Sequence, residues 1–247
     1  PDNTSGLPSG NIADCAFTGT EAYLAVKNYG VVVWETGSFE WSSLSGGGGG
    51  WYPLVFGYQL PSEEISALEL RGGTLWIATS AGLVRRSSNG NLRKYSTGEL
   101  ERSRRLLGNN VNDIALDRYG KLWVASDNGL NVIGQDGEVV AAYTSFDRWN
   151  STLSGLYPYS IISPLVSSVC NSICYDSSVD RVWVGTRNGL MGIDADISLF
   201  SGSVLTEAIL YPNPVITGEG DSGVYISRIG DKVDIEVFNI ERELVHR

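Results

Sequence analysis

Three stretches of the chain share one pattern, and this pattern decides the fold. They read GTLWIATSAGL (residues 73–83), GKLWVASDNGL (residues 120–130) and DRVWVGTRNGL (residues 180–190). Each has an apolar run centred on a tryptophan and a glycine six positions later. β-Branched and aromatic residues favour strands, and glycine readily adopts the positive φ of a tight hairpin turn. Each stretch is therefore predicted to form a β-hairpin.

A weaker fourth copy precedes these three. It reads AYLAVKNYGV (residues 22–31), with Leu24 in the tryptophan position. The repeated positions are Trp76, Trp123 and Trp183 for the tryptophan and Gly30, Gly82, Gly129 and Gly189 for the glycine. Consecutive copies are spaced about 50 residues apart, which is near the period of propeller blades.

Further apolar segments flank each hairpin, so each unit is predicted to contain four short strands. Four-stranded antiparallel units at this spacing are typical of a β-propeller, in which each sheet is buried between its neighbours. The sequence thus predicts an all-β fold with four propeller blades in residues 1–207, belonging to a larger propeller. The expected blades lie near residues 12–58, 65–107, 111–150 and 169–205.

Residues 208–247 are predicted to begin a second, C-terminal domain of the β-sandwich type. Pro212 and Pro214 mark the boundary, and alternating apolar residues follow them.

Composition excludes several classes of function. The net charge of −10 argues against nucleic acid as a partner, because binding a phosphate backbone needs clustered Lys and Arg. The single histidine, His246, argues against most metal sites and nucleophile–histidine systems, so neither an enzyme nor a cofactor is expected.

Cys15, Cys170 and Cys174 suggest neither a disulfide framework nor a zinc site, and Cys170 and Cys174 are expected to fill the core. No apolar run is long enough to span a membrane.

Aspartates recur at equivalent positions in the repeats. Asp14 matches Asp113, and Asp117 matches Asp176. Recurrence in several blades favours hydrogen bonding in turns or to the backbone over catalysis.

Other motifs carry a family resemblance. NTSGLPSGNI (residues 3–12), together with the LWIAT and DNGL elements, resembles the two-component regulator propeller repeat. YPNPV (residues 211–215) and VDIEVFN (residues 233–239) resemble the C-terminal β-sandwich domain of type IX secretion cargo in Bacteroidetes. Together these resemblances imply a noncatalytic component of the secretion attachment complex, in the periplasm or on the outer-membrane surface. The implied partners are the sortase, other secretion proteins, and a glycan or anionic lipopolysaccharide.

An anionic glycan would need a local basic patch on this acidic chain. The candidate ligand-binding residues are Arg102, Arg104 and Arg105, with Arg93 and Lys94 upstream, and the aromatics Trp51, Tyr52, Trp149, Tyr157 and Tyr159. Loops on a rigid scaffold are where binding usually resides, although each of these residues could instead be a packing or surface residue.

Two other functions stay open. The first is a periplasmic ligand-sensing propeller of a hybrid two-component histidine kinase. The second is a propeller lyase or glycosidase, for which Asp127 and Asp136 could be proposed, although their spacing does not make them a catalytic pair. The glycine run at residues 46–50 lacks the features of a phosphate-binding loop and is predicted to be a flexible loop.

Overall fold

The computed structural model of the chain describes residues 11–18, 21–35, 51–145, 157 and 159–196, and four short strands nearer the C-terminus. The chain divides into two compact units, Pro1–Ala195 and Asp196–Arg247. In the second unit, β17 (Ile209–Tyr211) pairs with β18 (Tyr225–Ser227), and β19 (Val237–Phe238) pairs with β20 (Leu244–His246), both antiparallel. The sites described below lie in the first unit.

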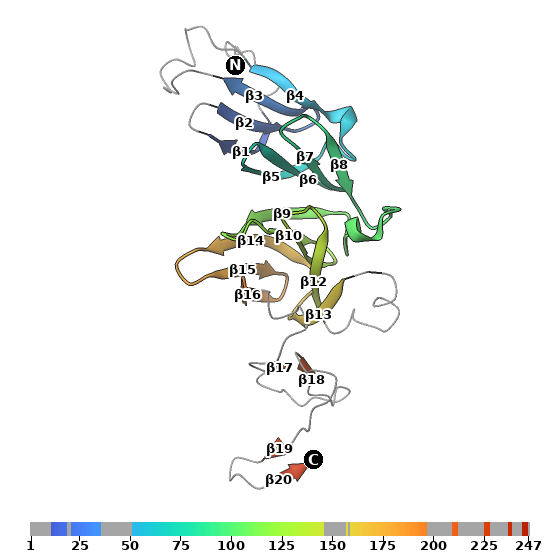
Figure 1. The fold of residues 1–247 in the computed structure, drawn as a ribbon, viewed down its shortest axis with the longest axis vertical. Coiled ribbons are helices and arrows are strands. Elements are labelled where there is room, and N and C mark those ends of the chain that lie inside the picture. The colour runs from blue at the N-terminus through green and yellow to red at the C-terminus, as the bar shows by residue number, and fades with distance from the viewer. Residues whose placement is uncertain are drawn as a thin grey trace. The chain divides into compact units, whose positions relative to one another are not determined.

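The first unit consists of four sheets that follow one another in chain order, which we call blades 1 to 4 (Figure 1). Blade 1 contains β1 (Ile12–Phe17), β2 (Glu21–Val26), β3 (Gly30–Glu35) and β4 (Trp51–Phe56). Blade 2 contains β5 (Ile65–Arg71), β6 (Thr74–Thr79), β7 (Gly82–Arg86) and β8 (Leu92–Tyr95). Blade 3 contains β9 (Val111–Leu116), β10 (Leu122–Ser126), β11 (Gly129–Ile133) and β12 (Val139–Ser145). Blade 4 contains β14 (Cys170–Asp176), β15 (Arg181–Thr186) and β16 (Gly189–Asp194).

The all-β propeller architecture predicted from the repeats is confirmed. Blades 1 to 3 are four-stranded antiparallel meanders, and blade 4 has three strands among the described residues. One strand was not predicted: β13 (Ser160–Leu165) pairs parallel to β12 at the outer edge of blade 3. Two short 3₁₀ turns, η2 (Gly57–Gln59) and η3 (Arg102–Arg104), lie in the connections between blades.

The repeated tryptophan packs towards the next blade. Trp76 belongs to the core between blades 2 and 3, together with Leu83 and Tyr95 of its own blade and Leu122 and Val124 of the next. Trp123 is fully buried and stacks on Tyr143, with the ring centroids 5.8 Å apart. Trp76 and Trp123 thus lie in the packed interior of the blades.

Strand register corrects the assignment of this position in blade 1. Tyr23 pairs with Ala16 as Trp123 pairs with Ala115, so Tyr23 and not Leu24 is the equivalent residue. The turn after β2 has three residues between Val26 and Gly30, whereas the turn after β6 has two between Thr79 and Gly82. An assignment that counts six residues back from Gly30 therefore reaches Leu24, one residue after the true equivalent Tyr23.

The repeated glycine is needed for two reasons. Gly30, Gly82, Gly129 and Gly189 have φ values of 129°, 136°, 140° and 134°, which side-chain-bearing residues rarely adopt. At Gly129, a Cβ atom would also lie 2.5 Å from the carbonyl oxygen of Tyr143 on the neighbouring strand. In all four copies the turn thus ends at a backbone conformation that favours glycine.

One carboxylate links the innermost strands at each interface between blades. Asp14 accepts a hydrogen bond from the Leu68 backbone N–H at 2.7 Å, and Asp113 accepts one from Ile173 at 2.9 Å. Glu69 accepts one from the backbone of Leu116. Burial raises the pKa of both Glu69 and Asp113. As predicted, the recurring Asp14 and Asp113 bind backbone groups.

Blades 1 and 4 each expose apolar or thiol side chains that no described blade covers. Ile12, Cys15 and Phe17 are exposed on the face of blade 1 that points away from blade 2, as are Cys174 and Leu190 on the far face of blade 4. Cys170 is buried as predicted, but the prediction for Cys174 is wrong, because no described blade covers its face. All three thiols are free.

Candidate functional site

The predicted ligand-binding residues are only partly described by the structure. Trp51 and Tyr52 begin β4, but their side chains lie outside the described residues, as do Trp149 and the glycine run at 46–50. Tyr157 and Tyr159 are described, and so are the three arginines, Arg102, Arg104 and Arg105. These two groups can therefore be compared in space.

The structure places the two tyrosines against the backbone of the loop that carries the three arginines. Residues 96–110 connect β8 to β9, and we call this segment the blade 2–3 loop. The Tyr159 hydroxyl donates to the Arg105 carbonyl oxygen at 2.5 Å, and the Tyr157 hydroxyl donates to that of Leu106 at 3.4 Å. The two rings pack against each other with their centroids 5.3 Å apart. Two groups that are 51 to 54 residues apart in sequence thus form one cluster.

Asn131, a buried polar residue of β11, ties this cluster to blade 3. Its Oδ1 accepts from the Leu107 backbone N–H at 2.9 Å, and its Nδ2 donates to the Tyr159 hydroxyl oxygen at 3.3 Å. A buried amide is costly unless its polar atoms are bonded, so these contacts fix the loop against the blade. Burial also raises the pKa of Tyr159, which keeps its hydroxyl protonated and able to donate.

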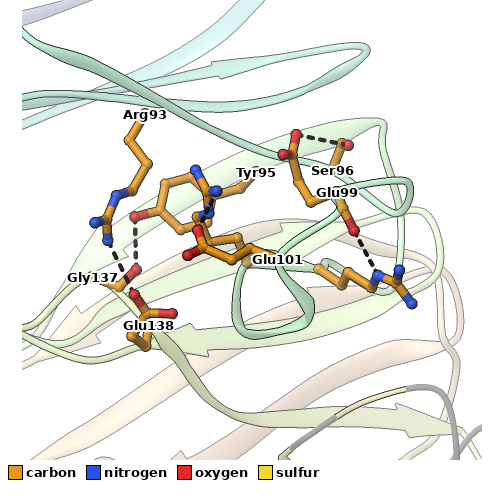
Figure 2. Close-up of polar contacts among 9 residues, drawn as sticks. Arg93, Tyr95, Ser96, Glu99, Glu101, Gly137 and Glu138 are labelled. Carbon is orange, nitrogen blue, oxygen red and sulfur yellow. Dashed lines mark hydrogen bonds and ion pairs between the residues drawn. The ribbon is translucent and has the colours of Figure 1, made fainter.

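The acidic residues of the loop offset part of its positive charge. Arg104 forms an ion pair with Glu101, and Arg105 Nε donates to the Glu99 carbonyl oxygen at 2.7 Å. The Glu99 carboxylate accepts from the Ser96 hydroxyl at 3.2 Å, as Figure 2 shows. Arg102 is exposed on η3 and is the arginine of the three most open to a ligand.

Beside this loop, β8 is anchored to blade 3. Arg93 Nη1 lies 3.1 Å from Glu138 Oε1, and the Tyr95 hydroxyl donates to the Gly137 carbonyl oxygen at 2.8 Å (Figure 2). Arg93, which the sequence suggested as part of a basic patch, is thus paired with a carboxylate. Its contact joins two blades.

The other recurring aspartates organise turns, as predicted. Asp117 is buried and accepts hydrogen bonds from the Lys121 backbone N–H at 2.9 Å and from Trp123 Nε1 at 3.0 Å. Asp176 accepts from the Ser178 backbone N–H at 2.9 Å in the corresponding turn of blade 4. Both carboxylates shape the turn that precedes the repeated tryptophan.

Asp127 and Asp136 do not approach each other as a catalytic pair would. Asp127 lies in the β10–β11 turn and Asp136 in the β11–β12 turn, which are at opposite ends of blade 3. Asp136 Oδ1 accepts from the Glu138 backbone N–H at 3.0 Å. Across the described ranges, no group of three or more His, Cys, Asp or Glu side chains is placed to hold a metal ion.

A second polar cluster, which the repeat pattern does not predict, lies in the β9–β10 turn of blade 3. Tyr119 donates its hydroxyl to Asp180 Oδ2 at 2.6 Å, and the side chains of Arg118 and Lys121 both lie 5.2 Å from its ring centroid. These residues do not recur in the other blades, so a search for repeats passes over them. The sequence signal was the run RYGK at residues 118–121, two cations around an aromatic residue in a turn.

The comparison with protein families supports the repeat. The sequence model described as two component regulator propeller matches residues 105–128, which cover the end of the blade 2–3 loop and the first two strands of blade 3. A search of curated protein sequences finds no match. None of the helical segments in the described part of the chain has the length and apolarity of a membrane span.

Solved structures share the fold at low sequence identity. PorZ, described as an essential surface component of the type-IX secretion system of Porphyromonas gingivalis, is 16% identical with a TM-score of 0.57, over 98% of this chain and 33% of PorZ. The extracellular domain of the putative hybrid two component system BT4673 from B. thetaiotaomicron is 18% identical with a TM-score of 0.50, over 75% of this chain and 21% of that one. Virginiamycin B lyase from Staphylococcus aureus is 12% identical with a TM-score of 0.42, over 79% of this chain and 58% of the lyase. The chain thus spans a third or less of the first two proteins, and it shares a propeller fold with them.

Proposed function

We propose that this chain is part of a noncatalytic, extracytoplasmic propeller protein that binds an anionic glycan such as lipopolysaccharide and assists the sortase of a secretion complex. The observation that carries the proposal is the packing of Tyr157 and Tyr159 against the arginine-bearing blade 2–3 loop. The two rings thus lie against the backbone of a loop that carries three arginines, although rings and loop are far apart in sequence.

The chemistry of this cluster suits a charged sugar. Aromatic rings offer apolar faces with polar tips, and a guanidinium group binds phosphate or carboxylate oxygens with paired hydrogen bonds. Tyr157 is half-buried and Arg102 is exposed, so both can meet a ligand while Tyr159 and Asn131 hold the loop in place. A loop ordered in advance loses less conformational entropy on binding.

The fold shared with PorZ supports the cellular role. PorZ is described as a surface component of the type-IX secretion system, and the resemblance of residues 208–247 to a type IX C-terminal domain points to the same setting. Assistance to the sortase and a place in the periplasm or on the outer-membrane surface belong to this proposal. A partner sortase would be captured by the purified full chain from detergent-solubilised outer membranes.

The glycan part is tested by capture of the full chain on beads coated with anionic lipopolysaccharide. We expect the double variant R102A/Y157A to lose most of the binding, because it removes the exposed cation and the accessible ring. Tyr58→Ala is the control, because Tyr58 is a 79% exposed tyrosine that lies on η2, in the connection between blades 1 and 2, and not in the blade 2–3 loop. Neutral dextran beads should retain neither protein.

Capture that is equal for R102A/Y157A and the native chain would overturn the assignment of this site. Capture by neutral dextran would overturn the requirement for negative charge. Thermal melting followed by circular dichroism should show a folded double variant with at most a small loss of stability, because Y157A removes one long hydrogen bond and one ring contact while the Asn131 and Tyr159 bonds remain.

A second function, ligand sensing in the periplasm, is favoured by the shared fold with the extracellular domain of BT4673. In that case the blades bind a glycan fragment and pass a conformational signal to a kinase. The gene sequence downstream of residue 247 discriminates the two functions: a kinase module supports sensing, and a complete sandwich domain that ends the gene excludes it.

A further inference from the structure

The β9–β10 turn of blade 3, residues 117–121, departs from the repeat. The equivalent turn of blade 2 is formed by Gly72 and Gly73, and that of blade 4 by residues 177–180 with the sequence SSVD. Of these three described turns, only that of blade 3 contains two cationic residues and an aromatic residue. Architecture common to all blades does not account for a feature present in one of them.

This turn is held rigidly by its neighbours. Arg71 of blade 2 donates from Nη1 to the Asp117 carbonyl oxygen at 2.6 Å and from Nη2 to that of Arg118 at 3.3 Å. Gln135 of the β11–β12 turn donates to the Tyr119 carbonyl oxygen, and the buried Asp117 carboxylate holds Lys121 from within the blade. The backbone of the turn is therefore fixed before any ligand arrives.

The side chains of the turn form a compact cationic surface. The guanidinium of Arg118 and the ammonium of Lys121 each lie 5.2 Å from the ring centroid of Tyr119, within cation–π distance. The Tyr119 hydroxyl donates to Asp180 at 2.6 Å, and Tyr175 donates to the other oxygen of the same carboxylate at 2.8 Å. The ring is thus fixed by the hydroxyl at its tip, with both cations beside it.

The cations keep hydrogen-bonding capacity for a ligand. Arg118 uses Nη2 towards Asp180 and Tyr119, which leaves the N–H groups of Nε and Nη1 without a partner among the described residues. Lys121 forms no ion pair within that part of the chain. Arg71, Arg118 and Lys121 outnumber the carboxylates of Asp117 and Asp180 by one, in a chain with a net charge of −10.

We infer that this turn is a second anion-binding site, which takes the phosphate group of a phosphorylated sugar. Phosphate oxygens accept from Lys121 and from the open side of the Arg118 guanidinium. The sugar part of this inference rests on the proposed glycan function, whereas the phosphate part rests on the geometry of the turn. The site lies at the end of blade 3 opposite the β10–β11 turn and is separate from the tyrosine–arginine cluster.

The test is a heteronuclear NMR titration of the full chain with glucose 6-phosphate, inorganic phosphate and glucose, at low ionic strength. We expect glucose 6-phosphate to shift the amide signals of residues 118–121 and to bind more tightly than inorganic phosphate, while glucose causes no shift. Lys121→Ala should weaken the binding of glucose 6-phosphate by about tenfold, the typical contribution of a charge-assisted hydrogen bond. Lys27→Ala is the matched control, because it removes one half-exposed lysine from blade 1 and should leave binding unchanged.

Three results would overturn the inference: no shift at residues 118–121 with either phosphate probe, equal affinity of K121A and the native chain, or equal loss in K27A. Equal affinity for glucose 6-phosphate and inorganic phosphate would overturn the assignment to a sugar. The two proposals fail separately, because R102A/Y157A tests lipopolysaccharide capture and leaves the turn intact. The Lys121 backbone bond to Asp117 survives in K121A, so an unchanged melting curve shows that the variant is folded.

Discussion

Blades 3 and 4 carry the same repeated residues in opposite surroundings. Leu130 and Leu190 follow the repeated glycine in each blade, yet Leu130 is 0% exposed and Leu190 is 69% exposed. Trp123 is 0% exposed, whereas Trp183 is half-buried with Arg181 over its ring. The pattern encodes a surface that becomes a core only where another blade covers it.

The largest difference is expected for the tryptophans. Trp123→Ala should lower the free energy of unfolding by about 3–5 kcal/mol, the usual cost of removing a buried large aromatic side chain. Trp183→Ala should cost less than half as much, because part of its ring already meets water. Urea denaturation followed by far-ultraviolet circular dichroism measures both, and equal losses would remove the contrast between the blades.

The next largest difference in stability is expected between the leucines that follow the repeated glycine, Leu130 and Leu190. Leu130→Ala removes a fully buried side chain and should cost about 2–5 kcal/mol. Leu190→Ala changes an exposed surface and should stay within about 0.5 kcal/mol. The same denaturation curves give both values. A large loss in L190A would mean that the far face of blade 4 is covered in the folded protein.

Alanine substitutions of two turn glycines distinguish the cost of backbone strain from the cost of a steric clash. Gly129→Ala meets the Tyr143 carbonyl oxygen at 2.5 Å and also an unfavourable φ, so it should cost about 2–4 kcal/mol. Gly189→Ala has a similar φ but no atom within 4 Å, so about 1 kcal/mol is expected. Thermal melting of the two variants checks the order. If the two glycine variants lose the same stability, strain alone explains the repeat.

The smallest effect concerns pH. Glu69 and Cys174 occupy equivalent positions, and Glu69 is enclosed between blades 2 and 3. Burial, helped by the charges of Asp14 and Asp113, raises the pKa of Glu69. A carboxyl with a higher pKa in the folded chain binds protons more strongly there, so its contribution to stability grows as pH falls through that pKa and is lost as pH rises above it.

Glu69→Gln removes this titration while it keeps an oxygen that can accept from Leu116. We expect the free energy of unfolding to increase less between pH 7 and pH 5 in E69Q than in the native chain, as measured by urea denaturation at each pH. Asp113, whose pKa is also raised by burial, remains in both proteins. An identical pH dependence in E69Q and the native chain would show that Glu69 does not titrate differently on folding.

The repeat made the blades predictable, because tryptophan, glycine and aspartate recur for reasons of packing, turn geometry and backbone bonding. The error at Leu24 arose because turn length changes between blades, and spacing measured through a turn does not report strand register. The meeting of Tyr159 with Arg105 depends on the path of the chain over 54 residues, which no local pattern encodes. The ion pair of Arg104 with Glu101 could be expected from their spacing of three residues. The cationic turn at Arg118–Lys121 does not recur in other blades, so its only signal in the sequence is the run RYGK.

The carboxylate links between inner strands have a direction. In each of the three, a side chain of one blade binds a backbone N–H of the following blade, at Leu68, Leu116 and Ile173. Every residue except proline has a backbone N–H, so the donor is present whichever other residue stands at these three positions. Each blade therefore constrains its successor by backbone geometry and not by residue identity, so this link by itself restricts the donating position only against proline. Exchange of a blade between relatives therefore requires a carboxylate in the blade that precedes the exchange and another in the new blade, which binds the blade after it.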